Sequence, residues 1–252
     1  MRMNELGQPV GHPVPGWTPR PPATAAVLNG RYCRLERLDP HRHAEELFAA
    51  DQLDARGESW TYLPYGPFDT LADYRHWVEQ VCGGDDPLFY AVVDNTDTDP
   101  AAPGGEQRCV GVLSFLRMQP EIGVIEIGHV HYSPLLQRRR AATEAQYLLA
   151  SHAFEELGYR RLEWKCDALN AASRSAAARL GFSYEGTFRQ AAVVKGRNRD
   201  TAWYSITDSE WPGLRDRFAS WLHPDNFDAQ GRQRTSLRGA GPVRHPPVST
   251  VT

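Results

Sequence analysis

The chain has 252 residues, of which 41% are hydrophobic and 23% charged, a composition that fits one large or two small globular domains. Its formal net charge of −3 excludes a global electrostatic attraction, so neither nucleic acid nor an anionic membrane is an expected partner. No apolar run approaches the roughly 20 residues that span a bilayer, and the N-terminus lacks the apolar segment of a secretory signal.

The first part of the chain predicts an extended arm followed by a strand and two helices. Residues 1–29 are rich in proline, which indicates an arm rather than a domain, and Trp17 is the candidate for anchoring it to the surface. Residues 32–38 predict a strand. Asp39–Pro40 then opens an amphipathic helix that includes Leu53 on its inner face. The next helix carries Tyr74 and Trp77, and either Asp69 or Thr70 is in place to cap it.

The segment between these two helices is dense in aromatic residues and prolines. It contains the four rings of Trp60, Tyr62, Tyr65 and Phe68. Such a rigid segment fits two structures: a buried elbow between the helices, or one wall of a substrate pocket. The sequence alone leaves both open.

Three apolar segments follow and predict an antiparallel meander. Residues 88–94 and 108–116 form its first two strands, joined by a polar loop at 95–107 that we expect to be mobile. Residues 124–132 are rich in β-branched side chains and form the third strand.

Three arginines then crowd the start of a helix, within Gln137-Arg138-Arg139-Arg140-Ala141-Ala142-Thr143. Apolar residues at spacings of three and four predict this helix from about 142 to 157, and Gly158 ends it. A helix N-terminus carries about half a positive charge and has free N–H groups, so cations there are unfavourable and acceptors are needed. A bound diphosphate would satisfy both conditions, whereas the alternative is a solvated basic loop.

The last part predicts a strand at 161–166, which the preceding helix joins by a crossover connection. Asn170 can cap a short helix that Gly181 ends. A hairpin of strands 182–194 and 201–207 and a helix ending near Leu222 complete the pattern.

The chain therefore divides into three parts. We expect a proline-rich arm at 1–29, a single folded domain at 30–223 and a mostly disordered tail at 224–252, where hydrophobic patterning is lost. No internal repeat is visible.

Three motifs within residues 30–212 carry a family resemblance. The first is Gln137 to Ala142, which matches the ends of a pyrophosphate loop Gln/Arg-x-x-Gly-x-Gly/Ala and has Arg140 at the usual glycine. The second is Asn170-Ala-Ala-Ser173 followed by Leu180-Gly181-Phe182, and the third runs from Glu185-Gly186 to Glu210-Trp211. In this order they resemble the GCN5-related N-acetyltransferases, in particular the branch that acetylates ribosomal-protein N-termini.

The resemblance implies a mixed α/β (α+β) fold, with helices on both faces of a mostly antiparallel central sheet. The family's fourth and fifth strands, here 124–132 and 161–166, would run parallel and splay apart around a thioester. The implied reaction is direct attack of a primary amine on acetyl-CoA, the co-substrate. The acceptor would be a protein N-terminus, an amino acid or a small amine.

The resemblance places acetyl-CoA along the third meander strand and the arginine loop. Backbone groups of Gly128, His129 and Val130 would pair with the pantetheine. The pyrophosphate would be held by Gln137, Arg138, Arg139, Arg140, Ala141, Ala142 and Thr143. Asn170 and Ser173 are further candidate contacts, although each also fits a capping role in its own helix. Glycine permits close approach of a backbone to phosphate, so Arg140 is a departure.

For catalysis, Glu126 is the candidate general base and Ser173 the candidate acid for the leaving thiolate. Glu126 also fits a structural carboxylate paired with an arginine. His129 and His131 titrate in the useful range, but strand histidines are more often structural. Asp200 fits either a residue that orients the amine or a clamp of its own hairpin. The aromatic residues Trp60, Tyr62, Tyr65 and Phe68 are the candidate acceptor wall.

The expected partners are acetyl-CoA and an amine acceptor, bound by a monomer or homodimer that needs no metal. Four cysteines lie far apart without a CxxC pair, which predicts reduced thiols in a cytoplasmic protein: Cys33, Cys82, Cys109 and Cys166. Two other functions stay open: a non-catalytic acyl-CoA-binding module, and a nucleic-acid-binding protein that uses the three arginines and the basic tail.

Overall fold

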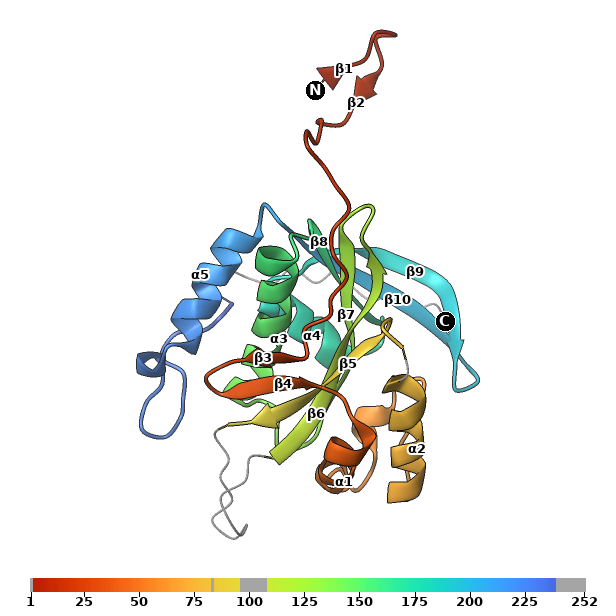
Figure 1. The fold of residues 1–252 in the computed structure, drawn as a ribbon, viewed down its shortest axis with the longest axis vertical. Helices are drawn as coiled ribbons and strands as arrows, with labels where there is room; N and C mark the ends of the chain where they lie inside the picture. The colour runs from red at the N-terminus through yellow and green to blue at the C-terminus, as the bar shows by residue number, and fades with distance from the viewer. Residues whose placement is uncertain (1, 83, 96–107, 239–252) are drawn as a thin grey trace.

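One sheet organises the part of the chain that the computed structural model describes, which is residues 2–82, 84–95 and 108–238 (Figure 1). The sheet has eight strands in the order β3-β4-β5-β6-β7-β8-β10-β9. In chain order they are β3 (Val27–Asn29), β4 (Cys33–Arg37), β5 (Leu88–Asp94), β6 (Arg108–Gln119), β7 (Val124–Tyr132), β8 (Arg161–Asp167), β9 (Ser183–Val194) and β10 (Arg197–Thr207). Neighbours are antiparallel except β7 and β8, which confirms the predicted mixed fold.

Helices cover both faces of the sheet (Figure 1). Strand β5 is buried throughout, and its alternate side chains enter two separate cores. On the side of Phe89 lie α1 (Pro40–Asp51), η1 (Glu58–Trp60) and α2 (Leu71–Cys82). On the side of Tyr90 lie α3 (Arg140–Ser151), the π-helical turn η2 (His152–Glu156), α4 (Ala171–Leu180) and α5 (Trp211–Leu222).

The parallel pair β7–β8 separates after a few residues. Residues 124–127 pair with 161–164, and β7 has no β8 partner beyond Ile127. Just past this point β7 is bulged, because Val112 faces His131 and Ser114 faces Gly128, which leaves two β7 residues opposite one of β6. His129 sits in this bulge with a φ of +51°. The predicted splay is therefore present, and the bulge adds a local bend to it.

Several boundaries differ from the sequence prediction. Helix α1 ends at Asp51, and Leu53, expected on its inner face, is 57% exposed. Thr70 rather than Asp69 caps α2, since its hydroxyl accepts the backbone N–H of Asp73. Strand β3 was not predicted, and β10 begins at Arg197 rather than at 201. Of the polar loop expected at 95–107, residues 96–107 lie outside the described part.

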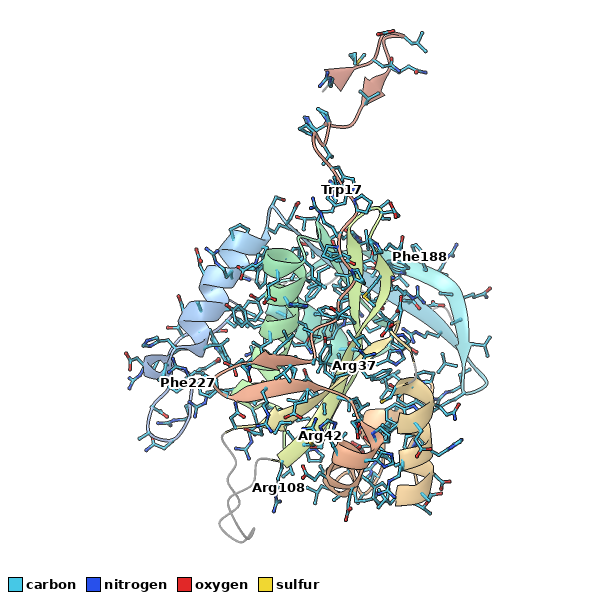
Figure 2. The ribbon with its side chains drawn as sticks, viewed as in Figure 1. Trp17, Arg37, Arg42, Arg108, Phe188 and Phe227 are labelled. Atoms are coloured by element: carbon cyan, nitrogen blue, oxygen red, sulfur yellow. The ribbon has the colours of Figure 1, made fainter. Side chains whose placement is uncertain are left out.

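The N-terminal arm begins with a small hairpin, β1 (Arg2–Met3) and β2 (Pro9–Val10), which Figure 1 shows away from the main body. Trp17, labelled in Figure 2, lies at the point where the arm reaches that body. Its indole N–H donates to the carbonyl of Glu121 at 2.9 Å, and the guanidinium of Arg20 lies 4.4 Å from its ring. The arm is therefore anchored at Trp17, as the sequence predicted.

The C-terminal stretch differs from the expected disordered tail. Residues 224–238 are described and begin with η3 (Pro224–Asn226). Asn226 donates to the carbonyl of Trp221, and Leu237 is buried in the core on the Tyr90 side of the sheet. Residues 239–252 lie outside the described part. No helix in the described ranges has the length and apolar character to cross a bilayer.

A buried carboxylate joins α3 to the turn between β3 and β4. Glu144 accepts backbone N–H groups of Arg31, Tyr32 and Cys33 at 3.0, 2.6 and 2.8 Å. Gly30 is required beside it, because a Cβ there would lie 2.5 Å from a Glu144 carboxylate oxygen. This contact fixes the first turns of α3, and with them the arginine loop, against the sheet.

Candidate active site

The opening between β7 and β8 leads to the N-terminus of α3. Arg139 occupies the N-cap position in an extended conformation, and no side chain caps the helix. The N–H groups of the first turn therefore have no side-chain acceptor. Arg138 and Arg139 are exposed at this end. Open N–H groups next to two exposed guanidinium groups are the kind of arrangement that can bind a phosphate-type anion.

Arg140 takes no part in that exposed pair. It is the first residue of α3, and its guanidinium lies 5.0 Å from the ring of Tyr32 and 4.5 Å from the ring of Phe227. Figure 2 labels Phe227 beside the loop that follows α5. The residue in a glycine-like conformation is instead Arg138, whose φ is +62°. The expected departure at Arg140 is thus compatible with the helix, and its side chain connects the C-terminal stretch to the core.

The N-terminus of α4 faces the same opening. The side chain of Asn170 accepts the backbone N–H of Ser173 at 3.0 Å and caps the helix, as predicted. The Ser173 hydroxyl oxygen accepts the indole N–H of Trp164 at 3.0 Å, which leaves the Ser173 proton for another acceptor. Burial raises the pKa of the Cys166 thiol, and the nearby Ser173 hydroxyl acts in the opposite direction. Ser173 can thus stabilise a thiolate placed beside it.

Glu126 belongs to β7 and lies across the gap from the N-terminus of α4, next to the bulge. A Cβ on Gly128 would lie 3.6 Å from its carboxylate. Lys165 Nζ donates to Glu126 at 2.8 Å and pairs with Glu163 at 2.7 Å. Burial raises the pKa of Glu126, while the Lys165 ion pair partly opposes this. The predicted pairing of Glu126 is therefore made mainly by a lysine, with Arg117 more distant at 3.7 Å.

The two strand histidines have separate partners. His129 Nδ1 is 2.9 Å from the hydroxyl of Tyr65. His131 Nε2 is 2.9 Å from the hydroxyl of Ser59, and its ring stacks on Trp60 at 3.6 Å. Burial lowers the pKa of both histidines to about 4, so both are neutral at neutral pH. Each can accept a proton only weakly.

Asp51 lies beside His131, with Oδ1 3.4 Å from the imidazole Nδ1, and burial raises its pKa to about 8. Between pH 6.5 and 8 the folded chain thus holds a proton on Asp51 that the unfolded chain has lost. Stability should fall over this window by about 2 kcal/mol, because the state that binds more protons loses stability as pH rises. The two histidines, which are neutral in the folded chain, affect stability only below pH 6.5. There stability rises with pH, because the unfolded chain binds more protons.

The measurement is the free energy of unfolding of wild type and Asp51→Asn from pH 6 to 9. The difference between the two proteins should change by about 2 kcal/mol between pH 6.5 and 8, since other titrating groups contribute equally to both. Parallel curves would show that Asp51 is ionised in the folded protein at pH 6.5.

The aromatic segment packs over the open ends of the strands and divides into two parts. Trp60 is 2% exposed, and Phe68 packs against it, which fits the buried elbow. Tyr62 and Tyr65 reach the opening, since the Tyr62 hydroxyl donates to the carbonyl of Leu169 at 3.3 Å and Tyr65 contacts His129. Trp60 and Phe68 thus form the buried elbow, and Tyr62 and Tyr65 remain the candidates for the substrate wall.

The β9–β10 hairpin closes this side. Lys195 Nζ donates to the carbonyls of Trp60 and Gly66 at 2.9 and 2.6 Å, and Arg197 donates to the carbonyl of Thr61. Asp200 accepts the backbone N–H of Gln190 and the side-chain amide of Asn198, so its contacts are those of the hairpin clamp.

Two donors of β10 were missed by the sequence reasoning. Within the described ranges, Arg199 Nε and Trp203 Nε1 are buried without a hydrogen-bond partner. They lie on the same face of β10. Trp203 is paired with Lys165 of β8, and Lys165 Nζ lies 3.8 Å from the Trp203 ring. After burial, the charge of Arg199 is the next cause of the low pKa of His129. The sequence predicted that this strand begins at 201, so it gave no reason to place Arg199 on it.

The arrangement combines an open anion site with a buried carboxylate across a gap between strands. Among the described residues, no three His, Cys, Asp or Glu side chains are grouped to hold a metal ion. The four cysteines carry free thiols. Such a site can hold an extended ligand by its phosphates and present the other end to a nucleophile beside Glu126.

Residues 33–183 match the acetyltransferase (GNAT) domain family. The crystal structure of a GCN5-related N-acetyltransferase from Brucella melitensis is 45% identical, covers 89% of this chain and 98% of its own, and has a TM-score of 0.84. A probable acetyltransferase of the GNAT family from Chromobacterium violaceum is 42% identical, covers 81% of this chain and 98% of its own, and has a TM-score of 0.72. The "Putative ribosomal N-acetyltransferase YdaF" of Bacillus subtilis is 37% identical over 71 residues, which span 28% of this chain and 39% of that protein.

Proposed function

The chain belongs to the acetyltransferase (GNAT) family, and from this premise we propose that it acetylates a primary amine held beside Glu126. It is an acyltransferase, and acetyl-CoA is its acyl donor. The observation that carries the proposal is the separation of β7 from β8 after Ile127. This separation lies between the open end of α3 on one side and the Glu126 carboxylate on the other.

The residues around the gap fit acetyl-CoA. Backbone groups of Gly128, His129 and Val130 on the β8 side have no strand partner, which supports pairing with the pantetheine amides. The first-turn N–H groups of α3 and the side chains of Arg138 and Arg139 support a pyrophosphate site. When bound, acetyl-CoA supplies the thioester whose acetyl group is transferred.

Glu126 and Ser173 supply the proton transfers in this proposal. Glu126 takes the proton of the ammonium group, directly or through water, and its raised pKa supports that role because an ideal base titrates near the working pH. The amine nitrogen forms its bond to the acetyl carbon as the carbon–sulfur bond breaks. Ser173, whose oxygen accepts from Trp164, gives its proton to the leaving sulfur and is restored by the second proton that the acylated nitrogen loses.

The arginine loop gives a test of the donor site. We expect Arg138→Ala with Arg139→Ala to weaken acetyl-CoA binding by about 10- to 100-fold, since both guanidinium groups can make charge-assisted bonds to phosphate. Arg140→Ala should leave the affinity within about threefold and lower stability by about 1–2 kcal/mol, because its side chain stacks on two rings.

Calorimetric titration with acetyl-CoA and chemical denaturation of the same variants give the two readings. A large loss of affinity in Arg140→Ala, with Arg138 and Arg139 variants unaffected, would place the pyrophosphate elsewhere. An amine screen that follows thiol release then tests transfer itself. No turnover with any peptide, amino acid or small amine would favour a non-catalytic acyl-CoA-binding module.

The proposed acceptors are peptide N-termini and amino acids, with simple amines as the weaker class. Arg199 Nε and Trp203 Nε1 are unpartnered donors beside Lys165 and His129. An oxygen next to the reacting amine, such as a first peptide carbonyl or an α-carboxylate, can accept from them. The printed name of the Bacillus subtilis relative, a ribosomal N-acetyltransferase, supports the peptide class.

Arg199→Ala tests this choice of acceptor. The variant should raise KM for a peptide or amino-acid acceptor by about 10-fold or more, since a hydrogen bond to a charged group is lost. KM for an alkylamine should change little, because an alkylamine has no oxygen to bind. Equal effects on both acceptors would remove Arg199 from acceptor selection.

The non-catalytic alternative was motivated by Arg140 at the glycine position and by the absence of a carboxylate near Ala192, in the strand after Leu180-Gly181-Phe182. The first of these does not support it, because Arg140 is helical and its guanidinium lies against Tyr32 and Phe227. The nucleic-acid alternative predicts steep salt dependence of binding, which a titration of single-stranded DNA at two salt concentrations measures. The free thiols support the proposal that the protein works in a reducing compartment such as the cytoplasm.

A further inference from the structure

A cavity of about 190 Å³ lies between the end of α1, the η1 segment and the start of α2. Its apolar walls are the rings of Phe48, Trp60, Phe68 and Tyr74. Its acidic side chains are Asp51, Asp54 and Asp69, against one base, Arg56. No residue of β7, β8 or β10 lines it, so this cavity is separate from the acyl-transfer gap.

Asp51 is the unusual group of this cavity. Its side chain is 4% exposed, and in the described part of the chain neither carboxylate oxygen has a hydrogen-bond partner. The Tyr74 hydroxyl lies beside Asp51 and is equally buried; it makes no short hydrogen bond, but as a donor it acts to lower the pKa of Asp51 against the larger effect of burial. An unpaired carboxylate in such a place is unfavourable by several kcal/mol unless a proton or a cation compensates it.

In the unliganded protein at pH 7 a proton on Asp51 supplies that compensation. The neighbouring groups among the described residues supply no cation. The Ser59 hydroxyl donates to Asp54 at 2.7 Å, so His131 Nε2 is the donor in the His131–Ser59 contact. A neutral His131 then has no hydrogen on Nδ1, the atom that faces Asp51. Arg56 has an 84% exposed side chain and is paired with Glu58. Asp51 therefore faces the His131 acceptor, the Tyr74 hydroxyl and aromatic rings, with no cation from the described residues in contact.

Ser59, His131 and Asp51 stand in the order of a hydrolase triad, but the oxyanion donors are missing. The backbone N–H groups of Glu58 and Ser59 both donate to Asp54. Burial acts to raise the pKa of Asp54, but these bonds and the Ser59 hydroxyl hold it below its ordinary value. Ser59 is thus bound to an ionised carboxylate and is not poised as a nucleophile.

We propose that this cavity binds a small primary ammonium ion, at a site separate from the acyl-transfer centre. The two oxygens of Asp51 and that of Tyr74 match the three N–H donors of a primary ammonium group. The four rings provide apolar and cation–π walls for its alkyl part and charge. The rim carboxylate of Asp69 adds attraction from the exposed side.

A ligand in this cavity can affect the acceptor side of the gap through Trp60. That ring stacks on His131 of β7, and the Trp60 carbonyl accepts from Lys195 of the hairpin. A ligand against Trp60 and Asp51 therefore touches the residues that hold the hairpin over the gap. The site is in a position to modulate acceptor access without contacting the acceptor.

Calorimetric titration of the full chain with n-propylammonium at pH 7 tests the proposal. Wild type should show saturable one-to-one binding, with propanol and potassium as non-binding controls. Asp51→Asn should bind at least about tenfold more weakly, and Tyr74→Phe should also lose affinity. Asp69→Asn, which removes an exposed carboxylate from the same cavity, should stay within about threefold.

Two further readings separate this site from the active site. In buffers of different ionisation enthalpy, wild type should release protons on binding, because the ammonium displaces a proton from Asp51, and Asp51→Asn should release none. Glu126→Gln should keep wild-type affinity. Equal binding by Asp51→Asn and wild type, loss of binding in Glu126→Gln, or equal binding of propanol would each overturn the proposal, whatever the outcome for acetyl transfer.

Discussion

Glu144→Ala is expected to lower the free energy of unfolding by about 3–6 kcal/mol, because three backbone N–H groups lose their shared acceptor and each buried, unsatisfied donor costs about 1–3 kcal/mol. The donors are those of Arg31, Tyr32 and Cys33 in the turn between β3 and β4. A loss of this size removes a large part of the stability of a domain, which is about 5–15 kcal/mol in total. Chemical denaturation followed by far-UV circular dichroism measures it.

Two variants control this result. Glu156→Ala removes an exposed carboxylate just beyond the same helix; this carboxylate contacts Nδ1 of the buried His152 at 2.9 Å, so its loss should cost only about 1 kcal/mol. Glu144→Gln keeps one acceptor oxygen and should fall between wild type and alanine. A Glu144→Ala protein as stable as Glu156→Ala would mean that water replaces the carboxylate at these N–H groups.

Glu126→Gln is expected to lower kcat by about 10²–10⁴-fold, the usual contribution of a positioned general base. Folding should survive the change, because Lys165 keeps its ion pair with Glu163 when Glu126 becomes neutral. The affinity for acetyl-CoA should stay near that of wild type, since the anion site is on the other side of the gap. Thiol release with the best amine of the screen gives kcat.

Glu163→Gln is the matched control for Glu126. Both carboxylates bind the same Lys165 and occupy paired positions on neighbouring strands. Only Glu126 lies against the bulge, so Glu163→Gln should lower kcat less than about tenfold. Equal losses in both variants would assign the effect to the ion-pair network rather than to proton transfer. If Glu126→Gln kept full activity, the base would be sought at His129 and Tyr65.

The elements that carry the motifs were predictable from the sequence for physical reasons. Helix α3 has an apolar stripe at helical spacing, and Asn170 and Gly181 mark the two ends of α4. Buried strands such as β5 are continuous apolar runs. The order of these elements, together with the three motifs and the family resemblance that they carry, was sufficient for the fold and the acyl donor.

What the sequence did not show depends on contacts between distant segments. The bulge at His129 changes which face later β7 side chains occupy, and alternation alone does not show it. The role of Arg140 depends on Tyr32 and Phe227, which lie 108 and 87 positions away. Lys195 and Arg199 lie near the candidate site only because the hairpin folds back over the aromatic segment.

The early separation of β7 from β8 has a consequence for the integrity of the sheet. Among the described residues, the strand pairs that join the β3–β7 part to the β8–β10–β9 part are those from Val124 to Ile127. A donor molecule whose amides pair with the free edge of β7 would act as a surrogate strand and complete the interrupted ladder. Amide hydrogen exchange in residues 128–132 would then slow when the protein is saturated with the co-substrate. Co-substrate binding and the local stability of the sheet would thus be thermodynamically linked.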